Sequence, residues 1–134
     1  MLFSDKELRE ILLSADQNFL EELYGKARET AKATFSNKIY IRALIEFSNY
    51  CKEGCYYCGI NRNKSSVHRF RLTKEEIYSA AESAYEAGFR TFVLQGGEDT
   101  HFTDEIFVEI ISHLKKNYDA AITLSLGVRS YESY

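Results

Sequence analysis

The chain has 134 residues, 45% of them hydrophobic and 28% charged, and its formal net charge at pH 7 is -3. These values are typical of an ordered globular protein, and they exclude a disordered chain and the strongly basic composition of many nucleic-acid-binding proteins. No apolar run approaches the roughly 20 residues of a membrane-spanning helix, and the first residues lack the layout of a signal peptide. We therefore expect a cytoplasmic protein with reduced thiols and with neither a nucleic-acid nor a membrane partner.

Residues 1–36 are predicted to form a helical extension of two helices. Ser4 and Glu7 have the spacing of a capping box at the start of the first helix, and Asp16 can cap the second. The apolar residues of both helices keep the three-to-four spacing of one helix face. They are Leu8, Ile11, Leu12, Phe19, Leu20, Leu23, Tyr24, Ala27 and Ala31. The segment carries no catalytic set of side chains, so it is either a packing appendage or a lid over the rest of the fold.

From residue 37 to residue 134, strand patterns alternate with helix patterns. Strands are predicted over residues 39–47, 90–95 and 120–126. One helix begins after a capping box of Thr73 and Glu76 and stops at Gly88, and a second runs over residues 103–117. This alternation favours an α/β fold with a parallel sheet and right-handed crossovers, in which functional residues gather at the carboxyl ends of the strands.

All three cysteines of the chain lie within eight consecutive residues, directly after the first predicted strand, as Cys51, Cys55 and Cys58. Thiolates bind iron-sulfur clusters and zinc, and this close spacing allows one short loop to surround one inorganic centre. A four-iron cubane normally takes four protein ligands, so three thiolates would leave one iron open for chemistry. The sequence therefore predicts a metal centre at the end of the first strand.

Three other interpretations of the cysteine loop stay open on the residues alone. A structural zinc site would need a fourth ligand, for which His68 is the local candidate. A redox-active pair at Cys55 and Cys58 would leave Cys51 without a role. Three buried core cysteines are the third interpretation, although charged neighbours in the loop are a poor match to an apolar core. An electron-transfer cubane would require another cysteine, and the chain has none.

The loop, with Tyr57 directly before its last cysteine, resembles the cluster-binding loop of the radical S-adenosylmethionine (SAM) superfamily. The segments 41–48, 55–62, 93–99 and 123–127 are similar to the HydE group of FeFe-hydrogenase maturases, whose nearest cousins are biotin synthase and methylornithine synthase. The resemblance implies the amino-terminal part of a (β/α) barrel, with about three parallel strands and their crossover helices preceded by two helices. We expect the chain to be an amino-terminal fragment of a longer protein.

The resemblance also implies the cofactors and their contacts. Cys51, Cys55 and Cys58 would hold a 4Fe-4S cluster, and S-adenosyl-L-methionine would bind its open iron. The implied contacts with SAM are Tyr57, Gln95, Gly96, Gly97, Glu98 and Ser125. Paired glycines at a strand end let the backbone approach a ligand, although they mark a turn about as often, and Ser125 is equally well explained as a satisfied strand hydroxyl.

The implied activity is generation of a 5'-deoxyadenosyl radical, which needs a reducing electron donor such as ferredoxin or flavodoxin and a small-molecule or metal-complex substrate. FeFe-hydrogenase maturation is the favoured role, with biotin or methylornithine synthesis as alternatives. A non-catalytic iron-sulfur or zinc domain is the competing class. No catalytic residue is assigned, and His101 and His113 are expected to face solvent because neither has a partner at ligand spacing.

Overall fold

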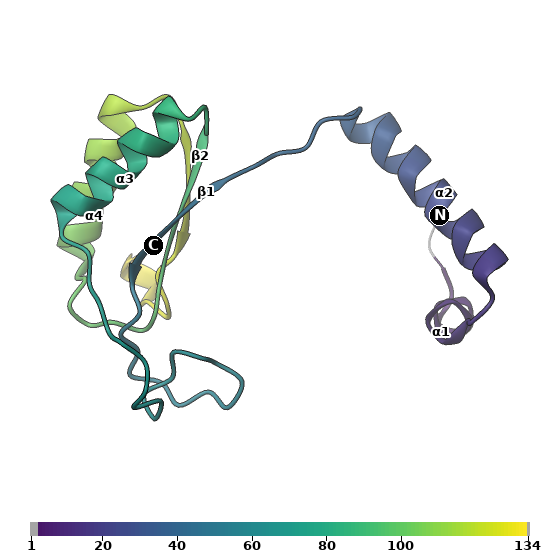
Figure 1. The fold of residues 1–134 in the computed structure, drawn as a ribbon, viewed down its shortest axis with the longest axis horizontal. Helices are drawn as coiled ribbons and strands as arrows, with labels where there is room; N and C mark the ends of the chain where they lie inside the picture. Colours follow the sequence, from purple (N-terminus) through teal and green to yellow (C-terminus); the bar gives the residue numbers. More distant parts are fainter. Residues whose placement is uncertain (1–2, 134) are drawn as a thin grey trace. The chain divides into compact units, whose positions relative to one another are not determined.

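The computed structural model describes residues 3–133, and its internal contacts divide the chain into two units, Met1–Tyr40 and Ile41–Tyr134. The first unit contains α1 (Asp5–Leu13) and α2 (Gln17–Phe35). The second contains β1 (Ala43–Ser48), α3 (Lys74–Glu86), β2 (Thr91–Gly96), α4 (Asp104–Asn117), β3 (Ala121–Ser125) and the short 3-10 helix η1 (Tyr131–Ser133), all shown in Figure 1. None of the helices within residues 3–133 is long and apolar enough to cross a membrane.

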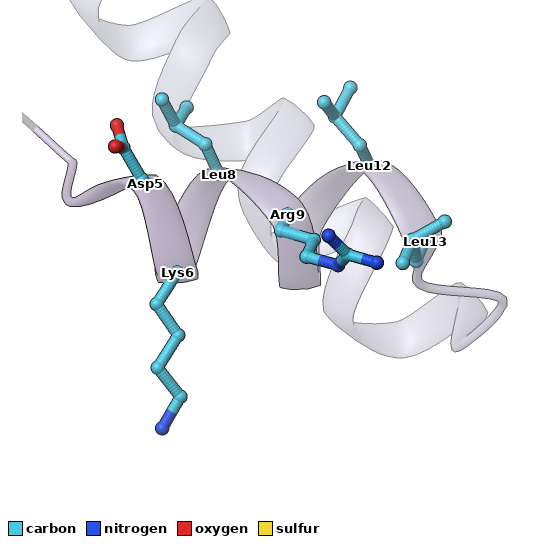
Figure 2. A pocket seen from close by; sticks show the side chains of 6 residues that line it. All are labelled: Asp5, Lys6, Leu8, Arg9, Leu12 and Leu13. Atoms are coloured by element: carbon cyan, nitrogen blue, oxygen red, sulfur yellow. The ribbon is translucent and has the colours of Figure 1, made fainter.

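The two helices of the first unit begin at the caps that the sequence predicts. The Glu7 backbone N–H donates to Ser4 Oγ at 3.3 Å, and the Asn18 N–H donates to Asp16 Oδ1 at 2.9 Å. Their apolar faces are not buried within residues 3–35, and Leu12 is 81% exposed. Figure 2 shows the leucines of α1 beside an open groove of about 600 Å³. The caps therefore fix where these helices start, while helix packing within this unit covers little apolar surface.

The second unit is a three-stranded parallel sheet with the order β1-β2-β3, which confirms the predicted fold. The first strand, however, begins at Ala43, four residues later than predicted. Ala43 pairs with Phe92 near the start of β2, and the residues before Ala43 have no strand beside them. Ile39 and Tyr40 are 88% and 73% exposed, so the alternating pattern over residues 39–42 reflects composition and forms no ladder.

Helices α3 and α4 cover one face of this sheet (Figure 1), and the hydrophobic core lies between them and the strands. Alternate strand residues point to this face, as the period of two requires. The core residues are Ile45, Phe47, Ile77, Ala81, Phe92, Leu94, Phe102, Phe107, Ile110, Leu114 and Ala120. The rings of Phe102 and Phe107 meet the Phe47 ring edge-on, with centroids 4.7 and 5.2 Å away. The core thus extends to the carboxyl end of β1, where the cysteine loop begins.

The helix ends in this unit mostly follow the sequence. Thr73 and Glu76 form the predicted capping box, with the Glu76 N–H donating to Thr73 Oγ1 at 3.2 Å. Thr103 occupies the N-cap of α4 without a side-chain cap bond. His101 is exposed, but His113 is half-buried and its ring stacks on Tyr78 with a centroid distance of 3.7 Å. The prediction that His113 faces solvent is therefore wrong, because its position on α4 faces α3 across the helix pair.

Candidate metal and cofactor site

The cysteine loop leaves the carboxyl end of β1 and runs to residue 70 as turns, with no helix or strand. All three of its thiols are free; Cys51 and Cys58 are half-buried and Cys55 is exposed. Backbone hydrogen bonds shape the loop locally, with Cys58 N–H donating to the Cys55 carbonyl at 3.1 Å and Arg62 N–H to the Glu53 carbonyl at 2.8 Å. The loop therefore presents reduced thiols at the edge of the sheet where parallel-sheet proteins place their sites.

The two glycines at the end of β2 pack closely against the end of β1 and the start of the cysteine loop. A Cβ atom on Gly97 would lie 2.2 Å from the Tyr50 carbonyl oxygen and 2.9 Å from Cys51 Cβ. The Gly97 N–H donates to the Ser48 carbonyl at 3.2 Å. A Cβ on Gly96 would lie 2.4 Å from the Phe47 ring. Both positions therefore require glycine for close packing, and Gly97 brings the second predicted binding loop into contact with a predicted metal ligand.

Glu98 connects its own loop after β2 to the cysteine loop and to the segment after β3. Its backbone carbonyl accepts a hydrogen bond from the Lys52 N–H at 3.2 Å, which ties it to the cysteine loop. Its carboxylate accepts a hydrogen bond from the Val128 N–H at 2.7 Å, which ties it to the segment after β3. One carboxylate oxygen is thus already engaged by protein backbone.

The remaining predicted contacts lie on the sheet face opposite the helices and at the tip of the loop. Gln95 pairs with Ser125 of β3 and with Glu46 of β1, so the three polar side chains form one row across the exposed face. Gln95 and Gly96 help to line a cavity of about 150 Å³ together with Glu46. Tyr57 is 93% exposed, so the structure places its ring in solvent and not against the row.

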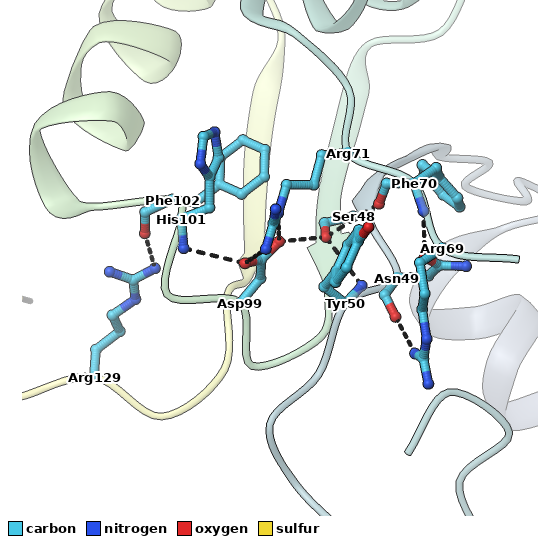
Figure 3. Close-up of polar contacts among 10 residues, drawn as sticks. All are labelled: Ser48, Asn49, Tyr50, Arg69, Phe70, Arg71, Asp99, His101, Phe102 and Arg129. Atoms are coloured by element: carbon cyan, nitrogen blue, oxygen red, sulfur yellow. Dashed lines mark hydrogen bonds and ion pairs between the residues drawn. The ribbon is translucent and has the colours of Figure 1, made fainter. Parts of the chain in front are cut away.

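A buried carboxylate that the sequence analysis did not single out holds the two loops together (Figure 3). Asp99 accepts hydrogen bonds from Ser48 Oγ at 2.6 Å, from Arg71 Nε at 2.7 Å and from the His101 N–H at 3.1 Å. Ser48 Oγ in turn accepts from the Tyr50 N–H at 3.1 Å, and the Arg71 guanidinium lies 3.9 Å from the centre of the Tyr50 ring. The network therefore fixes the backbone that leads into Cys51.

The charge of Asp99 is stabilised by these contacts. Burial by itself would raise the pKa of the Asp99 carboxyl, but the hydrogen bonds from Arg71 and Ser48 outweigh burial, and the pKa is held below its ordinary value. The same pairing raises the pKa of Arg71. A carboxylate in this position is therefore ionised at neutral pH. Sequence alone gave little sign of it, because Arg71 and Asp99 are 28 positions apart.

The chemistry of the donor set fits a thiolate-ligated iron centre. Three free thiols stand within one irregular loop, and the sequence has no fourth cysteine. In the part of the chain from residue 3 to residue 133, no three side chains of His, Cys, Asp or Glu are grouped as a metal site. The structure therefore places the cysteine loop beside residues 96–99, the glycine loop that ends β2. Among the described residues it does not group the three sulfurs as a metal site. His68, the candidate zinc ligand, is exposed.

The cysteine loop and the glycine loop meet at the carboxyl edge of the parallel sheet. This is where (β/α) barrels place their active sites. Residues 45–131 match the family model described as the radical SAM superfamily. The chain belongs to this superfamily, whose members use a 4Fe-4S cluster and SAM.

Individual relatives agree with this membership. The chain is 39% identical over 132 residues to the FeFe hydrogenase maturase subunit HydE of Thermotoga maritima, covering 98% of this chain and 38% of that protein. It is 35% identical over 127 residues to 3-methylornithine synthase of Methanosarcina acetivorans, covering 93% and 36%. The crystal structure of methylornithine synthase (PylB) superposes with a TM-score of 0.90 at 31% identity, covering 99% of this chain and 40% of that one. The chain thus spans about two fifths of the length of these relatives.

Proposed function

We propose that this chain is the cluster-binding and SAM-binding part of a radical SAM enzyme that acts in FeFe-hydrogenase maturation. In this proposal Cys51, Cys55 and Cys58 each ligate one iron of a 4Fe-4S cluster. The SAM contacts are Tyr57, Gln95, Gly96, Gly97, Glu98 and Ser125. Residues 1–36 form a helical extension and residues 37–134 the partial barrel, a division that the unit boundary between Tyr40 and Ile41 supports.

The observation that carries the proposal is the contact between the two loops. Gly97 packs against the Tyr50 carbonyl and the Cys51 Cβ atom, and the Lys52 N–H donates to the Glu98 carbonyl at 3.2 Å. A ligand held by the glycine loop would therefore lie beside whatever the thiols hold. An isolated electron-transfer or zinc domain needs a complete ligand set and no second loop beside it, so this arrangement favours the enzyme class.

The residues of this chain would position the bound cofactors and exclude water from them. The chemistry that the cofactors provide when bound is one-electron reductive cleavage of SAM to methionine and a 5'-deoxyadenosyl radical. The Asp99 network holds the approach to Cys51 in one conformation, and Gly97 lets the two loops come together without a side chain between them. The polar row of Glu46, Gln95 and Ser125 gives the sheet face hydrogen-bonding groups for a polar ligand.

The test is anaerobic reconstitution of the longest natural polypeptide that contains this sequence, with iron counting and Mössbauer spectroscopy. We expect four irons per chain in one oxygen-sensitive cluster, and a change in the EPR spectrum of the reduced cluster when SAM is added. Stoichiometric zinc in a protein that stays colourless after reconstitution would refute the cluster. An EPR spectrum unaffected by millimolar SAM would instead favour an electron-transfer role.

The substrate is proposed from the similarity to the relatives and needs its own test. Similarity to HydE supports FeFe-hydrogenase maturation. We extend the proposal to a metal-complex substrate, a ferredoxin or flavodoxin as the electron donor, and a location in the reducing cytoplasm. The close superposition on methylornithine synthase favours a small-molecule substrate as the second candidate. Deletion of the gene should abolish FeFe-hydrogenase activity and leave biotin and pyrrolysine synthesis intact. A deletion strain that keeps its hydrogenase activity would transfer the assignment to the second candidate.

A further inference from the structure

Arg69 binds both ends of the cysteine loop although it lies outside the cysteine motif. Its Nη1 donates to the Asn49 carbonyl at 2.5 Å and to the Ile60 carbonyl at 2.6 Å, and its Nη2 donates to the Asn61 carbonyl at 2.7 Å. Figure 3 shows the guanidinium beneath Asn49. Asn49 stands two residues before Cys51, while Ile60 follows Cys58 by two residues. One side chain therefore joins the entry and the exit of the loop.

Asn61 carries this connection to a predicted ligand. It is 5% exposed, its Nδ2 donates to the Cys58 carbonyl at 2.8 Å, and its Oδ1 accepts from the Asn63 N–H at 2.9 Å. The Asn61 carbonyl is the group that Arg69 holds. The chain of contacts from Arg69 through Asn61 to Cys58 thus sets where the last cysteine lies relative to the first.

The arrangement needs the guanidinium group specifically. A guanidinium has several N–H donors in a fixed planar fork, so it can serve three carbonyls at once, whereas a lysine ammonium is a point charge on a flexible stem. Its acceptors, which include the Lys64 carbonyl at 3.5 Å as a fourth and longer contact, are all neutral carbonyls. Among residues 3–133 no carboxylate forms an ion pair with Arg69. Its positive charge is therefore not cancelled by an ion pair among these residues.

The surrounding sequence adds to this positive field. The chain has a net charge of -3, yet residues 50–71 contain one acidic residue, Glu53. The basic residues in the same segment are Lys52, Arg62, Lys64, Arg69 and Arg71, of which Arg71 is ion-paired with Asp99. Neighbouring cations stabilise an anionic thiolate-ligated metal centre by electrostatic attraction. Arg69 is the member of this group whose hydrogen bonds also fix the loop backbone at both ends.

We propose that Arg69 is a positioning residue for the iron-sulfur centre: it closes the cysteine loop and contributes to that loop a positive charge that no ion pair within the described chain compensates. This inference rests on the proposed function and extends it to a residue outside the ligand motif. It predicts two separable effects. Loss of the fork should loosen the loop even before metal is present, and loss of the charge should make the bound cluster harder to reduce.

Two substitutions separate these effects, and Arg90 supplies a matched control. Arg69→Lys keeps the charge but loses the fork, while Arg69→Gln loses both. Arg90 likewise donates to two backbone carbonyls, those of Tyr85 and Phe89, and stacks on the Tyr85 ring at 3.8 Å, but it precedes β2 and lies at the opposite end of that strand from the loops. Arg90→Gln therefore removes a comparable arginine away from the cysteine loop.

Hydrogen exchange in the metal-free protein is the first measurement. We expect the amides of Cys58 and Asn61 to exchange about tenfold faster in both Arg69 variants, because charged hydrogen bonds of this kind are lost. Amides within β2 should keep their protection, which shows that the variants are folded. The second measurement is iron retention after anaerobic reconstitution, where we expect about 10- to 100-fold weaker binding. The third is the midpoint potential, which should fall in Arg69→Gln and stay near that of the wild type in Arg69→Lys.

Failure of the inference and failure of the proposed function give different results. If the wild type and Arg90→Gln hold a full cluster and both Arg69 variants match them in loop exchange, iron retention and potential, the positioning role of Arg69 is refuted alone. If the wild type itself holds no 4Fe-4S cluster after reconstitution, the proposed function is refuted and this inference with it.

Discussion

Substitution of Gly97 by alanine tests the contact on which the proposed function depends. The added Cβ would lie 2.2 Å from the Tyr50 carbonyl oxygen, where ordinary contacts begin near 3.4 Å. The obstacle is backbone, so the cysteine loop or the glycine loop must move by about 1 Å, because a close-packed interior offers no space to absorb the methyl group. Overpacking of this kind costs about 1–3 kcal/mol of the free energy of unfolding. The displaced segment carries Cys51, so cluster uptake should fall as well.

The assay compares Gly97→Ala with Gly59→Ala in the longest natural polypeptide that contains this sequence. Gly59 follows Cys58 directly, and a Cβ there would meet no atom within 4 Å. We expect urea unfolding to show the loss of stability in Gly97→Ala alone, and reconstitution to give less iron per chain in that variant. Equal stability and equal iron content in the two variants would show that the loops do not depend on close approach at Gly97, and the reasoning from that contact would be wrong.

Three further predictions follow from the site and the core. Cys55→Ala should abolish the four-iron cluster, measured as iron per chain after reconstitution, and a full complement of iron would exclude this thiol as a ligand. The lowered pKa of Asp99 means that its contribution to stability is present above the unfolded pKa of about 3.9 and is lost as the pH falls through the lower folded pKa. Urea titrations from pH 7 to pH 3 should show this loss, and Asp99→Asn should remove that part of the pH dependence. Phe92→Ala should cost about 3–5 kcal/mol of unfolding free energy, because this ring is fully buried at 0% exposure, and a loss below about 1 kcal/mol would contradict the assigned core.

Local patterns in the sequence were sufficient for the elements that have their own start and stop signals. The capping boxes at Ser4 and Thr73 lie where their spacing predicts, and the parallel order of the three strands follows from the alternation of strands and helices. The predicted start of β1 was wrong because strand length depends on the neighbouring strand, and the first residue of β1, Ala43, pairs with Phe92 near the start of β2. A pattern of alternating residues carries no information about where its partner begins.

The candidate site likewise contains residues that the sequence predicts and residues that it does not. The positions of the thiols and glycines at strand ends could be predicted, because their spacing and their place after a strand are local features. The hydrogen bonds by which Asp99 and Arg69 hold the cysteine loop, here called the bracing contacts, could not be predicted from the sequence, because they join side chains to groups many positions away. A charged residue in a loop is also expected by default to face water. Tyr57 is the opposite case, because a motif position gave it a role that its exposed side chain does not show in this structure.

The contacts of Asp99 and Arg69 that hold the cysteine loop lie within a short span of the chain, so they can form early in folding. Ser48 and Asp99 are separated by 51 positions, and Arg69 lies between them in the sequence. Both strand pairings of the sheet join strands that are consecutive in sequence. Contacts of modest sequence separation form early, and domains begin to fold during synthesis as the chain emerges. The cysteine loop can therefore reach its braced conformation while the ribosome is still adding residues.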